Sequence, residues 1–141
     1  MRKISIGYFA DGVWGLNSLK KILKQNKINI KFVCLRYRTP DKKILNFCKK
    51  KRIKVENFAK VNSLSSKKKI LNYKCDYLVS MSYDQIFGSF LVDKFKNKII
   101  NCHAGNLPFY RGRNVLNWVL INDEKEFGIT VHFVDEGIDT G

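Results

Sequence analysis

KISIGYFADGVWGLNSLKKIL (residues 3–23) is the stretch that decides the fold. Residues 3–10 form an apolar, β-like run that ends in a turn-prone Ala-Asp-Gly sequence. The apolar residues that follow recur at helical spacing, with lysines between them: Trp14, Leu16, Leu19, Ile22 and Leu23. The stretch therefore predicts a strand, a tight turn and a helix, in that order.

The same alternation continues along the chain. Further strand-like runs lie at 28–37, 53–55, 75–82, 98–103 and 127–134. Helix-like segments lie between them: one opened by Pro40, then 63–73, 90–96 and 114–122, the last with the pattern of a mostly buried helix. Strands joined by right-handed helical crossovers form a parallel sheet covered on both faces. We expect an α/β fold with a Rossmann-like open, mostly parallel sheet and helices on both faces.

The composition is that of one folded domain. The chain has 141 residues, 45% of them hydrophobic and 13% aromatic, which is enough to bury a real core. No apolar run approaches the roughly 18–20 residues that a membrane-crossing helix needs. The apolar stretch at the N-terminus is short and interrupted by Gly and Asp, unlike a signal sequence. We therefore expect a cytoplasmic protein without a membrane partner.

The net charge of +15 raises the question of a nucleic-acid partner. The charge comes mostly from lysines scattered along the predicted helices, as at 20–21, 49–51 and 67–69. Solvated helix faces explain most of such charge. Specific nucleic-acid binding is therefore not the favoured interpretation.

Four cysteines stand far apart, at Cys34, Cys48, Cys75 and Cys102, and no C-x-x-C pair occurs. With only two histidines in the chain, this spacing does not predict a metal site. We interpret the cysteines as reduced, mostly buried thiols. Cys102 neighbours His103 on a predicted strand, where adjacent side chains point to opposite faces, so it should point away from whatever His103 faces.

Ligands of open parallel sheets bind outside the carboxyl ends of the strands. Four polar or glycine-bearing segments follow predicted strands, at 11–15, 82–85, 101–113 and 135–139, and we expect all four at one edge of the sheet. The first is no GxGxxG fingerprint, so it is either a tight turn alone or an anion site at a helix start. No Walker-type sequence is present, which leaves ATP hydrolysis without support.

Asn101 and His103 lie two residues apart at a strand end and share one face of that strand. Alone they could be a purely structural pair, but Asp139 sits in a glycine-flanked loop after a strand that could lie beside theirs. Asn, His and Asp together suit addition to a carbonyl, with the amide and imidazole stabilising an oxyanion and the His–Asp pair moving protons. No Ser or Cys stands ready as a nucleophile, so a substrate amine should attack. His132 is interpreted as a structural histidine, with a position facing the site as the alternative.

Two motifs resemble those of folate-dependent formyltransferases: NCHAGNLP (101–108) and VHFVDEGIDTG (131–141). The resemblance spans essentially the whole chain and matches Asn101, His103 and Asp139 to the three catalytic positions of that family. It implies 10-formyltetrahydrofolate as the co-substrate. It also implies that two loops hold the pterin: Tyr83, Asp84, Gln85, Ile86 and Phe87 in one, and Val134, Asp135, Glu136 and Gly137 in the other.

The stretch from 107 to 141 looks most like the nucleotide-sugar N-formyltransferases, in which RGRN-x-LNW is common. The tRNA enzymes look more like RGAAP at that point, and the purine enzymes lack the RGR. This resemblance implies formylation of the amine of a nucleotide-linked amino sugar. The residues it implies for substrate binding are Asp11, Gly12, Asn106, Arg111 and Arg113. The two arginines suit a pyrophosphate, or they belong to a solvated basic loop or pair with carboxylates.

Two alternatives stay open: methionyl-tRNA formylation, and an inactive fragment that binds only folate or nucleic acid. Family members continue beyond the position of Gly141 with another strand and usually a further domain. The resemblance thus implies that residues 1–141 are the N-terminal, catalytic domain, incomplete at its C-terminal end. The longer protein could be a homodimer. Because catalysis needs close placement of the Asp139 carboxylate, we expect formyl transfer by these 141 residues alone to be weak or absent.

Overall fold

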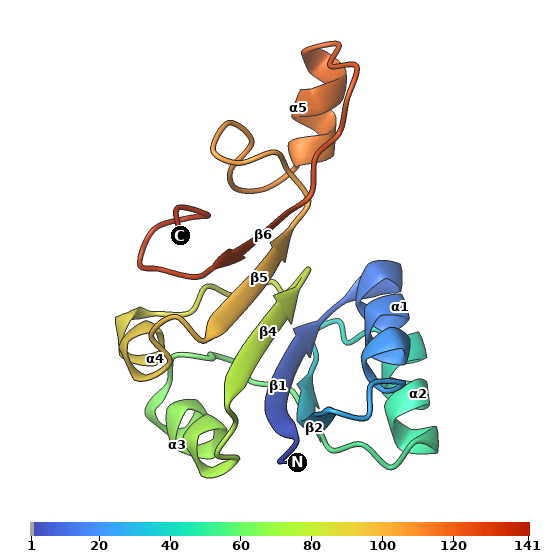
Figure 1. Cartoon of the computed structure of the whole chain (residues 1–141), viewed down its shortest axis with the longest axis vertical. Coiled ribbons are helices and arrows are strands. Elements are labelled where there is room, and N and C mark those ends of the chain that lie inside the picture. Colours follow the sequence, from blue (N-terminus) through green and yellow to red (C-terminus); the bar gives the residue numbers. More distant parts are fainter. Residues whose placement is uncertain (1) are drawn as a thin grey trace.

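The computed structural model describes residues 2–141 and contains one sheet (Figure 1). Its six strands are β1 (Ile4–Ala10), β2 (Ile28–Cys34), β3 (Val55–Glu56), β4 (Tyr77–Met81), β5 (Ile99–His103) and β6 (Thr130–Phe133). They lie in the order β3-β2-β1-β4-β5-β6, with every neighbouring pair parallel except β5 and β6, which are antiparallel. The predicted open, mostly parallel sheet is confirmed.

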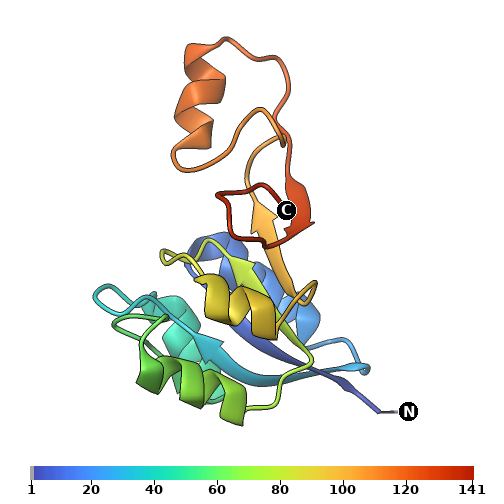
Figure 2. The ribbon, with the colours of Figure 1, turned by 90° about the vertical axis from the view of Figure 1, so that its left-hand side faces the viewer.

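Helices cover both faces of this sheet, as predicted (Figures 1 and 2). The helices are α1 (Gly12–Ile22), α2 (Lys42–Lys50), α3 (Leu64–Asn72), α4 (Ser89–Lys94) and α5 (Val115–Ile121). Neighbouring residues of β1 point to opposite faces: Tyr8 packs in the core under α1 and α2, and Phe9 packs in the core under α3 and α4. Both are fully buried, which explains why β1 reads as a continuous apolar run.

Two helices start at residues that cap them. The Asp41 carboxylate accepts hydrogen bonds from the backbone N–H groups of Lys43 and Ile44 at 2.8 and 2.9 Å, so Asp41 is the N-cap of α2. Pro40 therefore precedes the cap and does not open the helix, contrary to the prediction. Ser63 caps α3 by accepting a hydrogen bond from the N–H of Ser66.

The expectation of a mostly buried helix at 114–122 is wrong. Of the residues in α5, only Val115 is buried, whereas Trp118 is 56% and Leu120 is 79% exposed. Figure 1 shows the reason: α5 and its flanking loops form an arm that extends beyond the sheet. An apolar run predicts burial only where another element packs against it, and within residues 2–141 the outer side of α5 has no such neighbour.

The segment 135–139 does not leave the sheet at the same edge as the other three. Because β6 is antiparallel to β5, Thr130 lies opposite His103 and Phe133 lies opposite Ile100. The chain thus leaves β6 beside the lower half of β5 and then doubles back, so that Asp139 comes within 3.4 Å of Asn101. The predicted gathering of polar segments is reached, but the last one arrives by a return loop.

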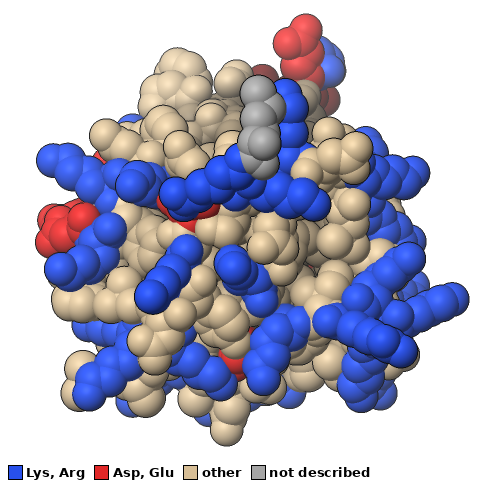
Figure 3. Space-filling model, turned by 60° about the horizontal axis from the view of Figure 1, so that its bottom comes forward, with Lys and Arg blue, Asp and Glu red and all other residues tan. Residues whose placement is uncertain are grey.

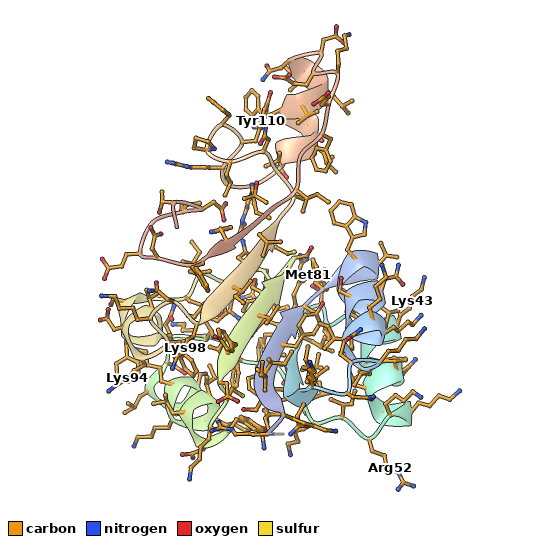
Figure 4. The ribbon with its side chains drawn as sticks, viewed as in Figure 1. Lys43, Arg52, Met81, Lys94, Lys98 and Tyr110 are labelled. Atoms are coloured by element: carbon orange, nitrogen blue, oxygen red, sulfur yellow. The ribbon has the colours of Figure 1, made fainter. Side chains whose placement is uncertain are left out.

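Lysines and arginines dominate the underside of the molecule, with few acidic residues between them (Figure 3). Arg52 and Lys94 belong to this lower end, away from the arm that carries Tyr110 (Figure 4). The lysines at 20–21 and 49–51 are exposed, in agreement with solvated helix faces. No helix within residues 2–141 is both long enough and apolar enough to cross a bilayer.

Candidate active site

A cavity of about 760 Å³ lies at the carboxyl-end edge of the sheet. It brings together many of the predicted site residues: Asn101, His103, Asp139, Tyr83, Asp84, Gln85, Ile86, Phe87, Val134, Gly137 and Arg113. Other predicted site residues are not part of its lining: Asp11, Gly12, Asn106, Arg111, Asp135 and Glu136. The Asp135 carboxylate instead accepts a hydrogen bond from the N–H of Gly137 at 3.0 Å, which shapes its own loop.

The catalytic candidates meet on one face of the sheet. Asn101 and His103 alternate with Cys102 along β5, and they lie on the same side as Ile99, in the core under α3 and α4. The third candidate, Asp139, has a left-handed backbone with φ of 51°, a conformation that Asp tolerates better than most residues. The return loop thus places the Asp139 carboxylate beside Asn101 and His103 of β5 and His132 of β6.

Four groups surround the Asp139 carboxylate, and its side chain is only 15% exposed. Its Oδ2 accepts a hydrogen bond from the N–H of Gly112 at 2.9 Å and lies 3.4 Å from Nδ1 of His103. Its Oδ1 lies 3.4 Å from the amide nitrogen of Asn101 and 3.5 Å from Nε2 of His132. The carboxylate is therefore held from the arm as well as from the sheet. This contact with the arm could not be anticipated, because a backbone N–H leaves no signal in the sequence.

His103 is held by its other nitrogen. Nε2 lies 2.5 Å from the backbone carbonyl oxygen of Tyr110, and a carbonyl can only accept, so the hydrogen is on Nε2. Nδ1 is left facing Asp139 at 3.4 Å. The side chain is 9% exposed. This geometry makes Nδ1 the nitrogen that can exchange a proton within the site.

Gly105 leaves room for this arrangement. A Cβ atom added to it would lie 2.5 Å from Nε2 of His103 and still closer to the carbonyl oxygen of Tyr110. We expect Gly105→Ala to displace the imidazole or the arm and to lower the free energy of unfolding by about 1–3 kcal/mol. The measurement is urea unfolding, together with the NMR signals of the His103 ring.

The matched control is Gly88→Ala, whose new Cβ would have the side chain of Asn62 as its nearest neighbour, at 3.1 Å. This variant should leave the His103 ring signals unchanged. Unchanged ring signals in Gly105→Ala would contradict the described packing.

Hydrogen bonds to residues 58–62 anchor the loop at 82–87. The Gln85 side chain accepts from the N–H of Val61 and donates to the carbonyl of Phe58, both at 2.7 Å. Asn62 donates to the carbonyl of Ile86 and accepts from the N–H of Gly88, both at 2.8 Å. Both polar groups of the Gln85 side chain are thus hydrogen-bonded to the protein backbone. These bonds fix the conformation of the loop that lines the cavity.

Two aromatic side chains, Tyr83 and Phe87, form one wall of the cavity. Phe9 makes edge-to-face contacts with Tyr83 and Phe87, with ring centroids 5.1 and 4.9 Å apart. The Cys34 thiol lies 3.6 Å from the Tyr83 hydroxyl. Burial raises the pKa of the Tyr83 phenol, and it raises that of the Cys34 thiol to about 11. Both groups are therefore neutral near pH 7, which gives this wall an apolar character.

Arg36 lines the cavity but was not among the predicted site residues. Its guanidinium lies 3.2 Å from the Asp11 carboxylate and donates to the carbonyl of Ser82 at 3.3 Å. Burial raises the pKa of the Asp11 carboxyl, and the neighbouring Arg36 opposes that rise. Arg36 lies two residues after Cys34, the last residue of β2. The predicted strand at 28–37 included Arg36, so the rule that ligands bind beyond strand ends did not point to it.

Arg113 also lines the cavity. Its guanidinium donates to the carbonyl of Asp84 at 3.2 Å, so the arm contacts the loop at 82–87. Arg111 is exposed and does not line the cavity. Of the two arginines of the RGR sequence, only Arg113 therefore stands at the site.

The chain also matches a known family over most of its length. Residues 12–141 match the sequence model described as formyl transferase. This match covers nearly the whole chain, so the chain belongs to the formyl transferase family. The family predicted from the two motifs is thereby confirmed.

Individual relatives carry the names of several branches. The chain is 44% identical to a methionyl-tRNA formyltransferase of Finegoldia magna over 66 residues, which is 47% of this chain and 21% of the relative. It is 37% identical to that of Thermodesulfovibrio yellowstonii over 97 residues, 69% of this chain and 29% of the relative. The aligned part thus spans less than a third of these curated relatives.

Solved structures share the fold. The phosphoribosylglycinamide formyltransferase of Bacillus halodurans superimposes with a TM-score of 0.84 at 23% identity, covering 97% of this chain and 75% of that one. A formyltetrahydrofolate deformylase of Pseudomonas syringae gives a TM-score of 0.83 at 17% identity, covering 100% of this chain and 49% of that one. At such identities the likeness establishes the formyltransferase fold and no particular acceptor.

Proposed function

We propose that residues 1–141 form a catalytic domain that transfers a formyl group from 10-formyltetrahydrofolate to a primary amine. One observation carries the proposal. The amide nitrogen of Asn101 and Nδ1 of His103 each lie 3.4 Å from an oxygen of the Asp139 carboxylate, and all three residues line one cavity. Their amide, imidazole and carboxylate are the groups that addition to a formyl carbonyl requires.

The cavity suits the proposed donor. About 300–1,000 Å³ is typical of small-molecule sites, and this cavity of about 760 Å³ lies within that range. The apolar wall of Tyr83 and Phe87 and the anchored backbone at 82–87 suit a flat heterocycle that needs both stacking and backbone hydrogen bonds. The bound donor supplies a formyl carbon on its N10, which the attacking amine takes over.

The protein groups act on the charge and the protons of this exchange. As the amine nitrogen bonds to the formyl carbon, negative charge grows on the formyl oxygen, and the Asn101 amide N–H can stabilise it. His103, held at Nε2 by Tyr110, has Nδ1 free to take the proton from the attacking amine and to return it to the departing N10. Asp139 stabilises the imidazolium formed in between. The products are the N-formylated amine and tetrahydrofolate.

The acceptor has two candidates. Methionyl-tRNA has the better support from the comparisons, because both curated relatives described above are methionyl-tRNA formyltransferases. The second candidate, a nucleotide-linked amino sugar, has its support in the RGRN-x-LNW sequence and in Arg36 and Arg113 at the cavity, where guanidinium groups suit phosphate oxygens. Both acceptors present a primary amine together with phosphate.

A direct comparison separates the candidates. The protein, in excess, is mixed with 10-[¹³C]formyltetrahydrofolate and either charged initiator tRNA or a dTDP-amino sugar, and the label is followed onto the acceptor amine. Excess protein makes even the weak transfer expected for this chain visible. Label on the tRNA favours the first candidate, and label on the sugar favours the second. Absence of transfer to either acceptor, together with absence of donor binding, would reject the proposed function.

A further inference from the structure

His132 is the second histidine of the site, and the proposed mechanism leaves it without a task. It lies in β6 directly opposite Asn101 of β5, in the antiparallel register. Its side chain is only 6% exposed, although the neighbouring Val131 and Phe133 are exposed on the other face. His132 therefore faces the cavity, which was the alternative to a purely structural role.

We infer that His132 is a positioning residue, which fixes the side-chain amide of Asn101 so that one of its hydrogens stays free for a substrate oxygen. This inference rests on the proposed function for its catalytic consequence. The hydrogen bonds that carry it involve only groups of the protein.

The contacts of the ring fix its tautomer. Nδ1 of His132 lies 2.9 Å from the carbonyl oxygen of Phe133, which can only accept, so Nδ1 carries the hydrogen. In the neutral ring, Nε2 is then an acceptor. Nε2 lies 3.3 Å from the amide nitrogen of Asn101, which can donate to it.

This acceptor decides which way the Asn101 amide points. If the amide were turned over, its oxygen would face two acceptors, Nε2 of His132 and Oδ1 of Asp139, and would repel both. In the orientation with the nitrogen inward, one amide hydrogen bonds to His132. The other reaches Asp139 at 3.4 Å, a long contact that a substrate oxygen can replace. His132 thus holds one hydrogen of the amide and leaves the other available.

Two substitutions separate positioning from a merely structural role. His132→Leu fills a similar space but offers no acceptor, whereas His132→Gln offers a carbonyl oxygen in place of Nε2. The control is Val131→Ala, at the neighbouring exposed position on the other face of β6. The readouts are the side-chain amide signals of Asn101 by NMR, assigned with Asn101→Asp, and the rate of formyl transfer with protein in excess.

We expect His132→Leu to speed hydrogen exchange of the Asn101 amide about tenfold, the effect of losing a hydrogen bond worth about 1.4 kcal/mol. The transfer rate should fall about 10–100-fold, as when an outer group that orients an active residue is lost, while donor affinity stays nearly unchanged. His132→Gln should restore most of both, and Val131→Ala should change neither.

The inference is overturned if the Asn101 amide signals in His132→Leu are the same as in the unchanged protein. It is also overturned if His132→Gln, folded by its circular dichroism, exchanges as fast as His132→Leu. Because the amide signals need no substrate, they decide the inference even if the protein transfers no formyl group. Failure of the proposed function is visible separately, in the transfer rate of the unchanged protein.

Discussion

Replacing His103 by alanine is expected to slow formyl transfer about 10³-fold, within the range that a general acid–base group contributes. The reason is positional: Nδ1 is the ring nitrogen left facing Asp139 and the cavity, since Nε2 is occupied by the Tyr110 carbonyl. The other imidazole of the cavity, His132, has its Nε2 engaged with the amide nitrogen of Asn101 at 3.3 Å. The measurement is the single-turnover rate of ¹³C-formyl transfer with protein in excess.

Lys98→Ala serves as the surface control, because Lys98 is exposed immediately before β5 and touches no part of the cavity. It should transfer the formyl group as fast as the unchanged protein. Donor affinity should also remain similar in His103→Ala, since the aromatic wall proposed to bind the donor is formed by other residues. A folded His103→Ala protein that keeps more than a tenth of the rate would contradict the assigned role.

Asp139→Asn is expected to slow the transfer about 10²–10³-fold, because the charge that stabilises the His103 imidazolium is lost. The substitution is conservative in every other respect. An Asn side-chain oxygen can still accept from the N–H of Gly112, and Asn, like Asp, tolerates the left-handed backbone with φ of 51°. Stability should therefore change little, and the measurements are the transfer rate and the midpoint of urea unfolding.

Asp123→Asn is a matched control for this prediction. Asp123 also has a left-handed backbone, with φ of 49°, but its side chain is 88% exposed and pairs only with Lys125. Its substitution tests what the change from Asp to Asn costs at such a backbone without touching the site. If Asp139→Asn transfers as fast as Asp123→Asn, the carboxylate has no part in the chemistry.

Periodicity predicted the parts of the site that lie on a strand. The two-residue spacing of Asn101 and His103 placed both on one face of β5, and the structure shows them there. The approach of Asp139 was also predicted, because its loop follows the strand beside β5. The route was not predicted, since the sequence does not show that β6 runs antiparallel and that the loop must return.

The remaining contacts depend on groups that a sequence does not mark. The N–H of Gly112 binds Asp139 and the carbonyl of Tyr110 binds His103, yet every non-proline residue carries such groups. His132 could be placed only once the register was known, because a shift of one residue would turn it to the other face. The exposure of α5 follows from the direction of the arm, which its apolar pattern does not specify.

The most direct test of the central claim is an NMR titration of the ¹⁵N-labelled protein with 5-formyltetrahydrofolate, a stable isomer of the proposed donor. We predict saturable shifts of the backbone amides at 82–87 and of the His103 ring nitrogens, with little change at the lysine-rich underside. Absence of binding, or shifts confined to residues away from the cavity, would contradict the assignment of this cavity as the site of formyl transfer.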